Sequence, residues 1–270
     1  MSSTVRTHES KVGVSMPPAN FAMDNILSQA TIAKTPKLSK PVEVAYQNSM
    51  STKLLVLNSK GGCGKSTFTM ALCRQLLNQS KKVEIIDLDV QQTAFHWGSG
   101  QDELRATRFQ FQRGRFFSLV VRVLKETDVT VIDTPSSFNH DELGRYLTLA
   151  QKIIIPIQPT SIDIHAALNF IQKLTQHPIY KQRRSPIALI ATRCLSSNQF
   201  ILFNKVFSHL NFDILGYMSA DIAYIEQFDF FGAFSTNKQV QDKAASSNKA
   251  HLNSNLDKKL WSKVSRWVTE

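Results

Sequence analysis

The sequence has little of what defines secreted, zinc-ribbon and membrane-spanning proteins. Its three cysteines, Cys63, Cys73 and Cys194, are widely spaced and odd in number. This pattern argues against a disulfide framework or a zinc ribbon and favours a reducing compartment. No apolar run approaches the ~20 residues that a membrane-spanning helix needs, and no secretory signal peptide is recognisable at the start. We therefore expect a cytoplasmic protein.

Acidic residues are scarce relative to basic ones. The 270-residue chain has 32 Lys and Arg against 21 Asp and Glu, which gives a formal net charge of +11. A protein this basic often binds a polyanion, either nucleic acid or an anionic membrane surface. A solubilising surface without any target has the same composition, so charge alone leaves these interpretations open.

Aromatic residues are nearly absent from residues 1–49, where only Phe21 and Tyr46 occur. The same segment is rich in Ser and Thr and holds four of the nine prolines. Such a composition buries too little apolar area to offset the entropy lost on ordering. We predict a disordered N-terminal extension over residues 1–49 and one domain over residues 50–270, with Met50 as an alternative start of translation.

From Ser51 onward, short apolar runs alternate with amphipathic ones. Strands are predicted over residues 54–57, 83–87, 129–133, 153–157, 187–191 and 212–216. Helices are predicted over residues 66–79, 116–126, 141–150, 162–176, 199–210 and 256–268. Apolar strands separated by helices indicate an α/β fold, a doubly wound, mostly parallel sheet with helices on both faces. The carboxyl ends of such strands meet at one edge, where ligand sites form.

A glycine-rich motif follows the first predicted strand. Residues 58–67 read Asn-Ser-Lys-Gly-Gly-Cys-Gly-Lys-Ser-Thr and run into a predicted helix. Glycines let a backbone wrap closely around phosphate, and a helix N-terminus adds positive potential. Lys65 is placed to reach the β- and γ-phosphates, and the Ser66 hydroxyl to ligate Mg²⁺. The predicted nucleotide-binding set is Lys60, Gly61, Gly62, Cys63, Gly64, Lys65, Ser66 and Thr67.

This motif departs from the ordinary P-loop, because Ser59 stands at the usual first glycine and Lys60 adds a second lysine. It resembles the deviant Walker A motif, Lys-Gly-Gly-x-Gly-Lys-Ser/Thr, of the ParA/MinD family of ATPases. Further family motifs follow in order, with Val90 in place of a proline in the first: residues 87–91, 129–135, 154–160 and 231–232. The resemblance covers about residues 52–232, lies closest to the ParA branch, and implies the fold of a P-loop NTPase.

The resemblance implies ATP and Mg²⁺ as cofactors, with Ser66 and Asp133 as the metal-binding residues. Lys65 would act on the bound phosphates, and Asp89 would position or polarise the attacking water. Asp87 would support the loop, and a turn-forming role remains the alternative for one of these two aspartates. Lys60 would cross a homodimer that sandwiches ATP and reach the phosphates of the partner. Lys60, Lys65 and Asp89 are thus the predicted catalytic residues.

Three segments are candidates for contact with a polyanion. Arginines alternate with aromatics in a predicted strand over residues 108–113 and its surroundings: Arg105, Arg108, Phe109, Phe111, Arg113, Arg115, Phe116, Phe117 and Arg122. A second basic set lies near the C-terminus: Lys238, Lys243, Lys249, Lys258, Lys259, Lys263 and Arg266. The helix over residues 256–268 is basic and amphipathic, so it either packs on the domain or binds a membrane as the tail of MinD does.

The resemblance implies a slow, partner-stimulated ATPase that dimerises around ATP and binds nucleoid DNA non-specifically. Such a switch would position or partition a cargo: a plasmid, a chromosome locus or a protein complex. A MinD-like ATPase that cycles on the membrane through residues 256–268 is the first alternative. A nucleotide-dependent scaffold with negligible hydrolysis is the second, which Val90 and the 49-residue extension keep open.

Overall fold

The computed structural model describes residues 51–109, 126–220 and 255–270, all within the unit Gln47–Glu270. Several predictions therefore lie outside the described residues, among them the extension over residues 1–49, all but the last residue of the helix over residues 116–126, and the role of residues 231–232. Glu126, the last residue of that predicted helix, lies in a turn.

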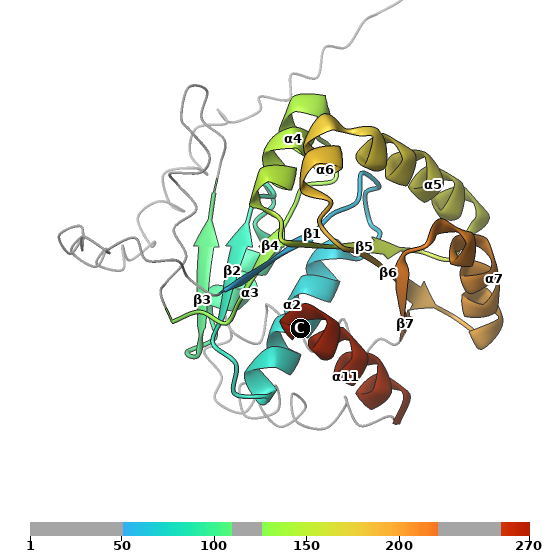
Figure 1. Ribbon diagram of the computed structural model, residues 1–270. Helices are drawn as coiled ribbons and strands as arrows, with labels where there is room; N and C mark the ends of the chain where they lie inside the picture. Colours follow the sequence, from blue (N-terminus) through green and yellow to red (C-terminus); the bar gives the residue numbers. More distant parts are fainter. Residues whose placement is uncertain (1–50, 110–125, 221–254) are drawn as a thin grey trace, which may run out of the picture. The chain divides into compact units, whose positions relative to one another are not determined.

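The core of the described structure is a seven-stranded sheet in which every neighbouring pair is parallel. The strands are ordered β3-β2-β4-β1-β5-β6-β7 (Figure 1). Their bounds are β1 Thr52–Val56, β2 Val83–Asp87, β3 Leu104–Arg108, β4 Val129–Asp133, β5 Lys152–Ile157, β6 Ile187–Cys194 and β7 Asp213–Ser219. The carboxyl ends of all seven strands consequently lie at one edge of the sheet.

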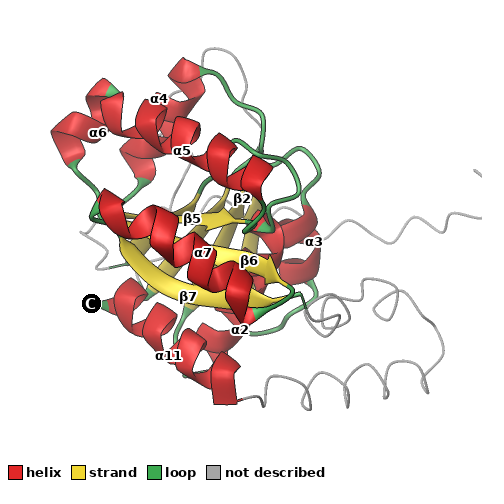
Figure 2. Ribbon diagram, turned by 90° about the vertical axis from the view of Figure 1, so that its right-hand side faces the viewer, coloured by secondary structure: helices red, strands yellow, loops and turns green. Residues whose placement is uncertain are grey.

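Helices cover both faces of the sheet (Figures 1 and 2). One face carries α2 (Lys65–Asn78), α3 (Thr93–Ser99) and α11 (Asn255–Thr269). The other carries α4 (His140–Leu149), α5 (Ser161–Gln176), α6 (Pro178–Arg183) and α7 (Ser197–Phe207), the last followed by a 3₁₀ turn over Ser208–Leu210. The predicted α/β fold, with its parallel sheet between two helical layers, is confirmed.

Alternation along the central strands divides the core into two clusters. Leu54 and Val56 pack toward α2 and α11, whereas Leu55 and Leu57 pack toward the opposite helical layer. All four side chains are fully buried, as expected for a strand covered on both faces. Two aspartates, Asp87 and Asp133, are the last residues of β2 and β4, so their carboxylates lie at the carboxyl edge of the sheet.

The sequence misplaced one strand and missed two short helices. A strand was expected over residues 108–113, but β3 occupies Leu104–Arg108, so the two ranges share only Arg108. Residues 110–113 lie outside the described residues. This edge strand buries Leu104 but exposes Arg105 and Arg108, which weakens its apolar signal. The short helices α3 and α6 were assigned no structure, because fewer than eight residues give little periodicity to detect.

The C-terminal helix α11 packs on the domain. Leu260, Trp261, Val264 and Val268 are buried, and the Trp261 ring stacks on Phe68 of α2 at 5.8 Å. The approach of α11 to β7 is closest at Gly216, which has a φ of +145° and where a Cβ would lie 2.9 Å from the Leu260 side chain. This contact favours the packed-helix interpretation over membrane insertion of the apolar face.

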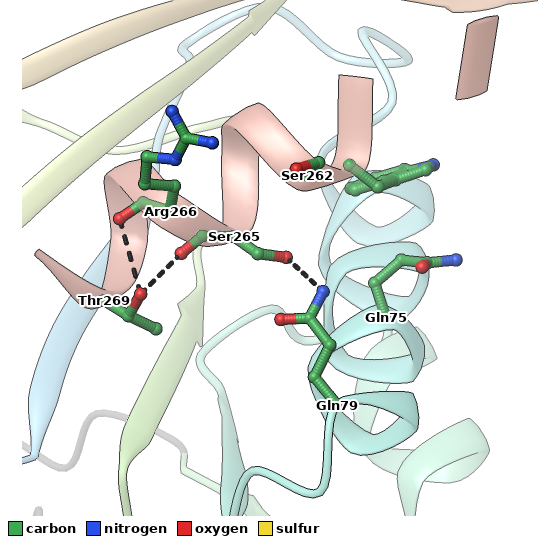
Figure 3. A pocket seen from close by; sticks show the side chains of 7 residues that line it. Gln75, Gln79, Ser262, Ser265, Arg266 and Thr269 are labelled. Carbon is green, nitrogen blue, oxygen red and sulfur yellow. Dashed lines mark hydrogen bonds between the residues drawn. The ribbon is translucent and has the colours of Figure 1, made fainter. Parts of the chain in front are cut away.

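Polar contacts also join α11 to α2. The Gln79 amide donates a hydrogen bond to the Ser265 hydroxyl at 3.0 Å (Figure 3). Beside this bond lies a polar cavity of about 450 Å³, lined by Gln75, Gln79, Trp261, Ser262, Ser265, Arg266 and Thr269. The helix that carries the glycine-rich motif is thus held along its length by the last helix of the chain.

Replacing Trp267 with Phe should lower the free energy of unfolding by about 1 kcal/mol, the usual value of one hydrogen bond. The Trp267 indole N–H donates to the Asp213 carboxylate at 2.8 Å, and Lys152 lies over its ring at 5.2 Å. Phenylalanine keeps a ring under Lys152 but removes the donor. Urea unfolding checks this value, with the exposed Lys259→Gln as control. Equal stability of the Trp267 variant and wild type would contradict the anchoring role of this bond.

Candidate functional site

The glycine-rich loop joins β1 to α2 at the carboxyl edge of the sheet. Gly62 and Gly64 have φ values of +73° and +90°, a conformation that glycine adopts without strain. Gly64 is the N-cap of α2 and provides no side-chain cap. The first N–H groups of this 14-residue helix therefore suit an anionic ligand, whose charge also complements the helix dipole.

Two lysines flank this loop in different environments. Lys65 is 7% exposed, and its ammonium donates to the Lys60 carbonyl oxygen at 3.4 Å. Lys60 is more open, with 44% of its side chain exposed, and its ammonium lies 3.8 Å from the Asp163 carboxylate at the start of α5. Thr160 holds that carboxylate through a hydrogen bond of 2.6 Å. The Lys65 side chain is thus buried against the loop, whereas the Lys60 side chain is held only by a long surface ion pair.

Ser66 and Asp133 meet as the sequence predicts. The Ser66 hydroxyl donates to Asp133 Oδ2 at 2.6 Å, and Thr69 donates to Oδ1 at 3.4 Å. Asp133 is fully buried at the end of β4. Burial raises the pKa of Asp133 to about 7, and the nearby Asp87 carboxylate adds to this rise. The Ser66 hydrogen bond and the Lys65 charge lower the pKa in part.

A hydroxyl and a buried carboxylate are oxygen donors of the kind that Mg²⁺ prefers. A cation beside Asp133 would offset the cost of its buried negative charge. Ser66 and Asp133 therefore fit the predicted metal-binding role by their chemistry and by their mutual contact.

The two aspartates after β2 have different surroundings. Asp87 is buried and accepts hydrogen bonds from the Asp89 and Phe95 backbone N–H groups, both at 2.9 Å. Burial raises the pKa of Asp87. It thereby connects the loop after β2 to α3, and the supporting role stays a prediction. Asp89 is half-buried, and its carboxylate accepts from the Gln91 N–H at 3.0 Å, an Asx turn.

Strand order explains why these residues meet. Strand β4 lies between β1 and β2, with Asp133 in register with Val56 on one side and Asp87 on the other. The glycine-rich loop, the loop after Asp87 and the Asp133 carboxylate thus converge from three adjacent strands. The sequence predicts this convergence only through the general rule that parallel strands end at one edge.

Sequence reasoning missed three side chains that hold the glycine-rich loop. Asn58 donates to the Pro156 carbonyl and accepts from the Lys60 N–H. Gln158, just after β5, donates to the Gly62 carbonyl at 2.8 Å. Thr192, near the end of β6, donates to the Cys63 carbonyl at 2.7 Å. Their positions at the carboxyl ends of β1, β5 and β6 are a signal that all three share.

The loop cysteine and the nearby arginine have limited chemistry. Cys63 is buried, and burial raises the pKa of its thiol, which disfavours the reactive thiolate. Arg193, the next-to-last residue of β6, is exposed and has a φ of 53°. This exposure is compatible both with a residue that flanks a nucleotide base and with an ordinary surface arginine.

The predicted polyanion-binding segments are described only in part. Arg105 pairs with the buried Glu84 at 3.5 Å, and Arg108 donates to Gln92 and lies over the Phe95 ring. Phe109 is partly buried against the core, and the other six members of the cluster lie outside the described residues: Phe111, Arg113, Arg115, Phe116, Phe117 and Arg122. Lys238, Lys243 and Lys249 also lie outside them. On α11, Lys259, Lys263 and Arg266 are exposed. Within the described ranges, no helix is both long enough and apolar enough to cross a membrane.

Comparison with protein families gives one match that covers most of the domain. The CobQ/CobB/MinD/ParA nucleotide binding domain matches residues 54–230. Among curated proteins, the chain is 26% identical over 140 residues to the maintenance of carboxysome distribution protein A of Gloeobacter kilaueensis. That alignment covers 50% of this chain and 64% of the relative, so it spans just under two thirds of the relative's length.

Solved structures with the same fold include partition and cell-division proteins. A putative plasmid partition protein of Borrelia burgdorferi, bound to AMPPNP, aligns with a TM-score of 0.55 and 17% identity over 81% of this chain and 98% of its own. The MinC:MinD complex of Aquifex aeolicus aligns with a TM-score of 0.58 and 14% identity over 82% of this chain and 96% of the matched one. At these identities the likeness establishes the fold.

Proposed function

We propose that this chain, which belongs to the CobQ/CobB/MinD/ParA family of nucleotide-binding domains, is an ATP-dependent switch that dimerises and binds nucleoid DNA to position a cargo. The observation that carries the proposal is the convergence of the glycine-rich loop, Lys65 and the Ser66–Asp133 pair at one edge of the sheet. Mg²⁺, when bound, supplies charge neutralisation for the phosphates.

In this proposal, each residue has a role that its surroundings support. The N–H groups at the start of α2 and the Lys65 ammonium bind the phosphates of ATP. Ser66 and Asp133 hold the metal ion. Asp89 orients the attacking water, while its Asx turn fixes its backbone. Hydrolysis of this kind depends on positioning and charge stabilisation. Because the protein is proposed to act as a switch, we expect slow turnover that a partner protein stimulates.

Dimerisation through the nucleotide-binding edge has support in exposed residues. Lys60 is open to solvent and only weakly paired, so it is available to a second copy. Three large apolar side chains follow strands at this edge: Val90, Ile162 and Leu195 are 76%, 76% and 80% exposed. Apolar groups left open around a binding edge are typical of surfaces that another protein covers.

The class of cargo is inferred only from similarity to other proteins. The curated relative is named for carboxysome distribution and one structural relative for plasmid partition. A protein complex or a plasmid is therefore the class of cargo that we propose, together with a partner protein that stimulates hydrolysis and resets the cycle. Non-specific DNA binding is supported by the net charge of +11 and by the exposed basic residues of α11.

Retention on non-specific duplex DNA should require ATP. With ATP, we expect at least about tenfold more retained protein than with ADP or without nucleotide. If about four phosphates are contacted, affinity should fall about a hundredfold between ~50 and ~200 mM salt. Retention measured with the three nucleotide states at both salt concentrations tests this. Equal retention in all three states would contradict a nucleotide switch, and ATP-dependent binding to anionic liposomes instead would support the membrane-cycling alternative.

A further inference from the structure

Two hydrogen bonds tie successive carbonyl groups of the glycine-rich loop to neighbouring strands. The Gln158 side-chain amide, after β5, donates to the Gly62 carbonyl at 2.8 Å. The Thr192 hydroxyl, on β6, donates to the Cys63 carbonyl at 2.7 Å. Neither donor belongs to the glycine-rich motif, and each comes from a strand beyond β1 in the sheet order.

These bonds constrain the direction of the loop's N–H groups. In a planar trans peptide, the carbonyl of one residue and the N–H of the next point in opposite directions. When Gln158 holds the Gly62 carbonyl, the Cys63 N–H points to the other side of the loop. When Thr192 holds the Cys63 carbonyl, the Gly64 N–H is oriented in the same way. Glycines 62 and 64, at positive φ, allow the backbone to reverse between these planes.

Strand β6 contains a bulge at Thr192, next to the glycine-rich loop. Ala191 is in register with Tyr217 of β7 and Cys194 with Ser219, so Thr192 and Arg193 together oppose Met218. Arg193 has a φ of 53°, which costs free energy for a residue other than glycine. The extra residue returns Cys194 to the cluster on the far face, while Thr192 stays buried beside Gly64. Bulges next to binding sites commonly redirect a side chain in this manner.

We propose that Thr192 and Gln158 are positioning residues for nucleotide phosphates, which they serve by orienting the Cys63 and Gly64 N–H groups toward the bound anion. This inference rests on the proposed binding of ATP at the glycine-rich loop. Neither side chain touches the ligand. Their effect is to hold the loop ready before binding, so that its N–H groups need not be ordered when the phosphates arrive.

The test uses variants of the full chain that remove one donor each. Thr192→Val keeps the shape of the side chain, and Gln158→Met keeps its length. Each should weaken binding of ADP and of inorganic tripolyphosphate about tenfold, which equals about 1.4 kcal/mol. Displacement of a fluorescent ADP analogue gives both affinities, and thermal unfolding without nucleotide gives stability. Thr192→Ser keeps the hydroxyl and should restore affinity to within about twofold of wild type.

Ser185→Ala is the matched control. The Ser185 hydroxyl donates to the Ala150 carbonyl at 2.9 Å in an equally buried position, just before β6 begins. Its loss should lower the melting temperature without changing either affinity. Unchanged affinities in Thr192→Val and Gln158→Met, or an equal loss in Ser185→Ala, would overturn the positioning role. If Thr192→Val does not fold, the half-buried Gln158 decides the question. Wild-type protein that binds neither ADP nor tripolyphosphate would overturn the proposed function itself.

Discussion

Replacing Lys65 with Ala should weaken ATP binding at least about a hundredfold, which equals about 2.7 kcal/mol. Lys65 is buried, and its ammonium donates a long hydrogen bond of 3.4 Å to the Lys60 carbonyl oxygen. A charged donor held in this way forms a strong, charge-assisted bond when phosphate is bound. Its removal also withdraws a positive charge that lowers the pKa of Asp133, the carboxylate that we propose binds the metal ion.

The expected loss at Lys65 is checked by calorimetric titration with ATP and Mg²⁺. Lys173→Ala is the matched control, because Lys173 is exposed in the last turn of α5 and its removal changes the net charge equally. The control should bind ATP as wild type does. Near-normal affinity in Lys65→Ala would contradict the placement of phosphates at the start of α2, whereas loss in both variants would indicate a general charge effect.

The parts of this site that the sequence predicts are those encoded by local contacts. The glycine-rich loop needs glycine at positive φ and lysine at the helix start, and both are visible within ten residues. Asp133 is predictable because it ends a run of apolar residues, and polar residues at strand ends lie at the edge of a parallel sheet. Such signals require no knowledge of which strands are neighbours.

Contacts that depend on strand order and register could not be predicted. Thr192 reaches the Cys63 carbonyl because β6 ends beside the glycine-rich loop, and no propensity marks Arg193 as the residue at positive φ. Gln158 reaches Gly62 because β5 is the neighbour of β1. Asp163 pairs with Lys60 for the same reason, since α5 begins just beyond β5. These residues are more than 90 positions away from their partners in the sequence.

The C-terminal helix shows where periodicity leaves two outcomes open. Its apolar stripe suits either a membrane surface or a protein surface, because both bury one face of a helix. The sequence ranks these outcomes only by their general frequency. In the structure, Gly216 gives Leu260 room to approach β7, and Phe68 offers a ring to Trp261. The deciding residues thus lie on other elements, outside the helix itself.

Replacing Lys60 with Ala should abolish ATP-dependent dimerisation while ATP still binds the monomer. In the fold, Lys60 makes a 3.8 Å ion pair with Asp163, and 44% of its side chain is exposed. Such an ion pair contributes at most about 1 kcal/mol. Lys60 can therefore leave Asp163 and contact a phosphate of the nucleotide that a second copy is proposed to bind. Removing Lys60 leaves the Lys65 ammonium and the N–H groups of α2 in place. Light scattering coupled to gel filtration, with ATP and without it, measures the dimer.

Asp163→Asn is the control that separates the two partners of Lys60. Asparagine keeps a side-chain oxygen near the Thr160 hydroxyl but removes the charge that pairs with Lys60. If the ion pair only holds Lys60 before ATP binds, this variant should dimerise at the same ATP concentration as wild type or a lower one. A full dimer in Lys60→Ala would exclude a trans contact by this lysine. Dimer loss in both variants would instead indicate that the Lys60–Asp163 pair itself shapes the dimer surface, because the two substitutions share only that contact.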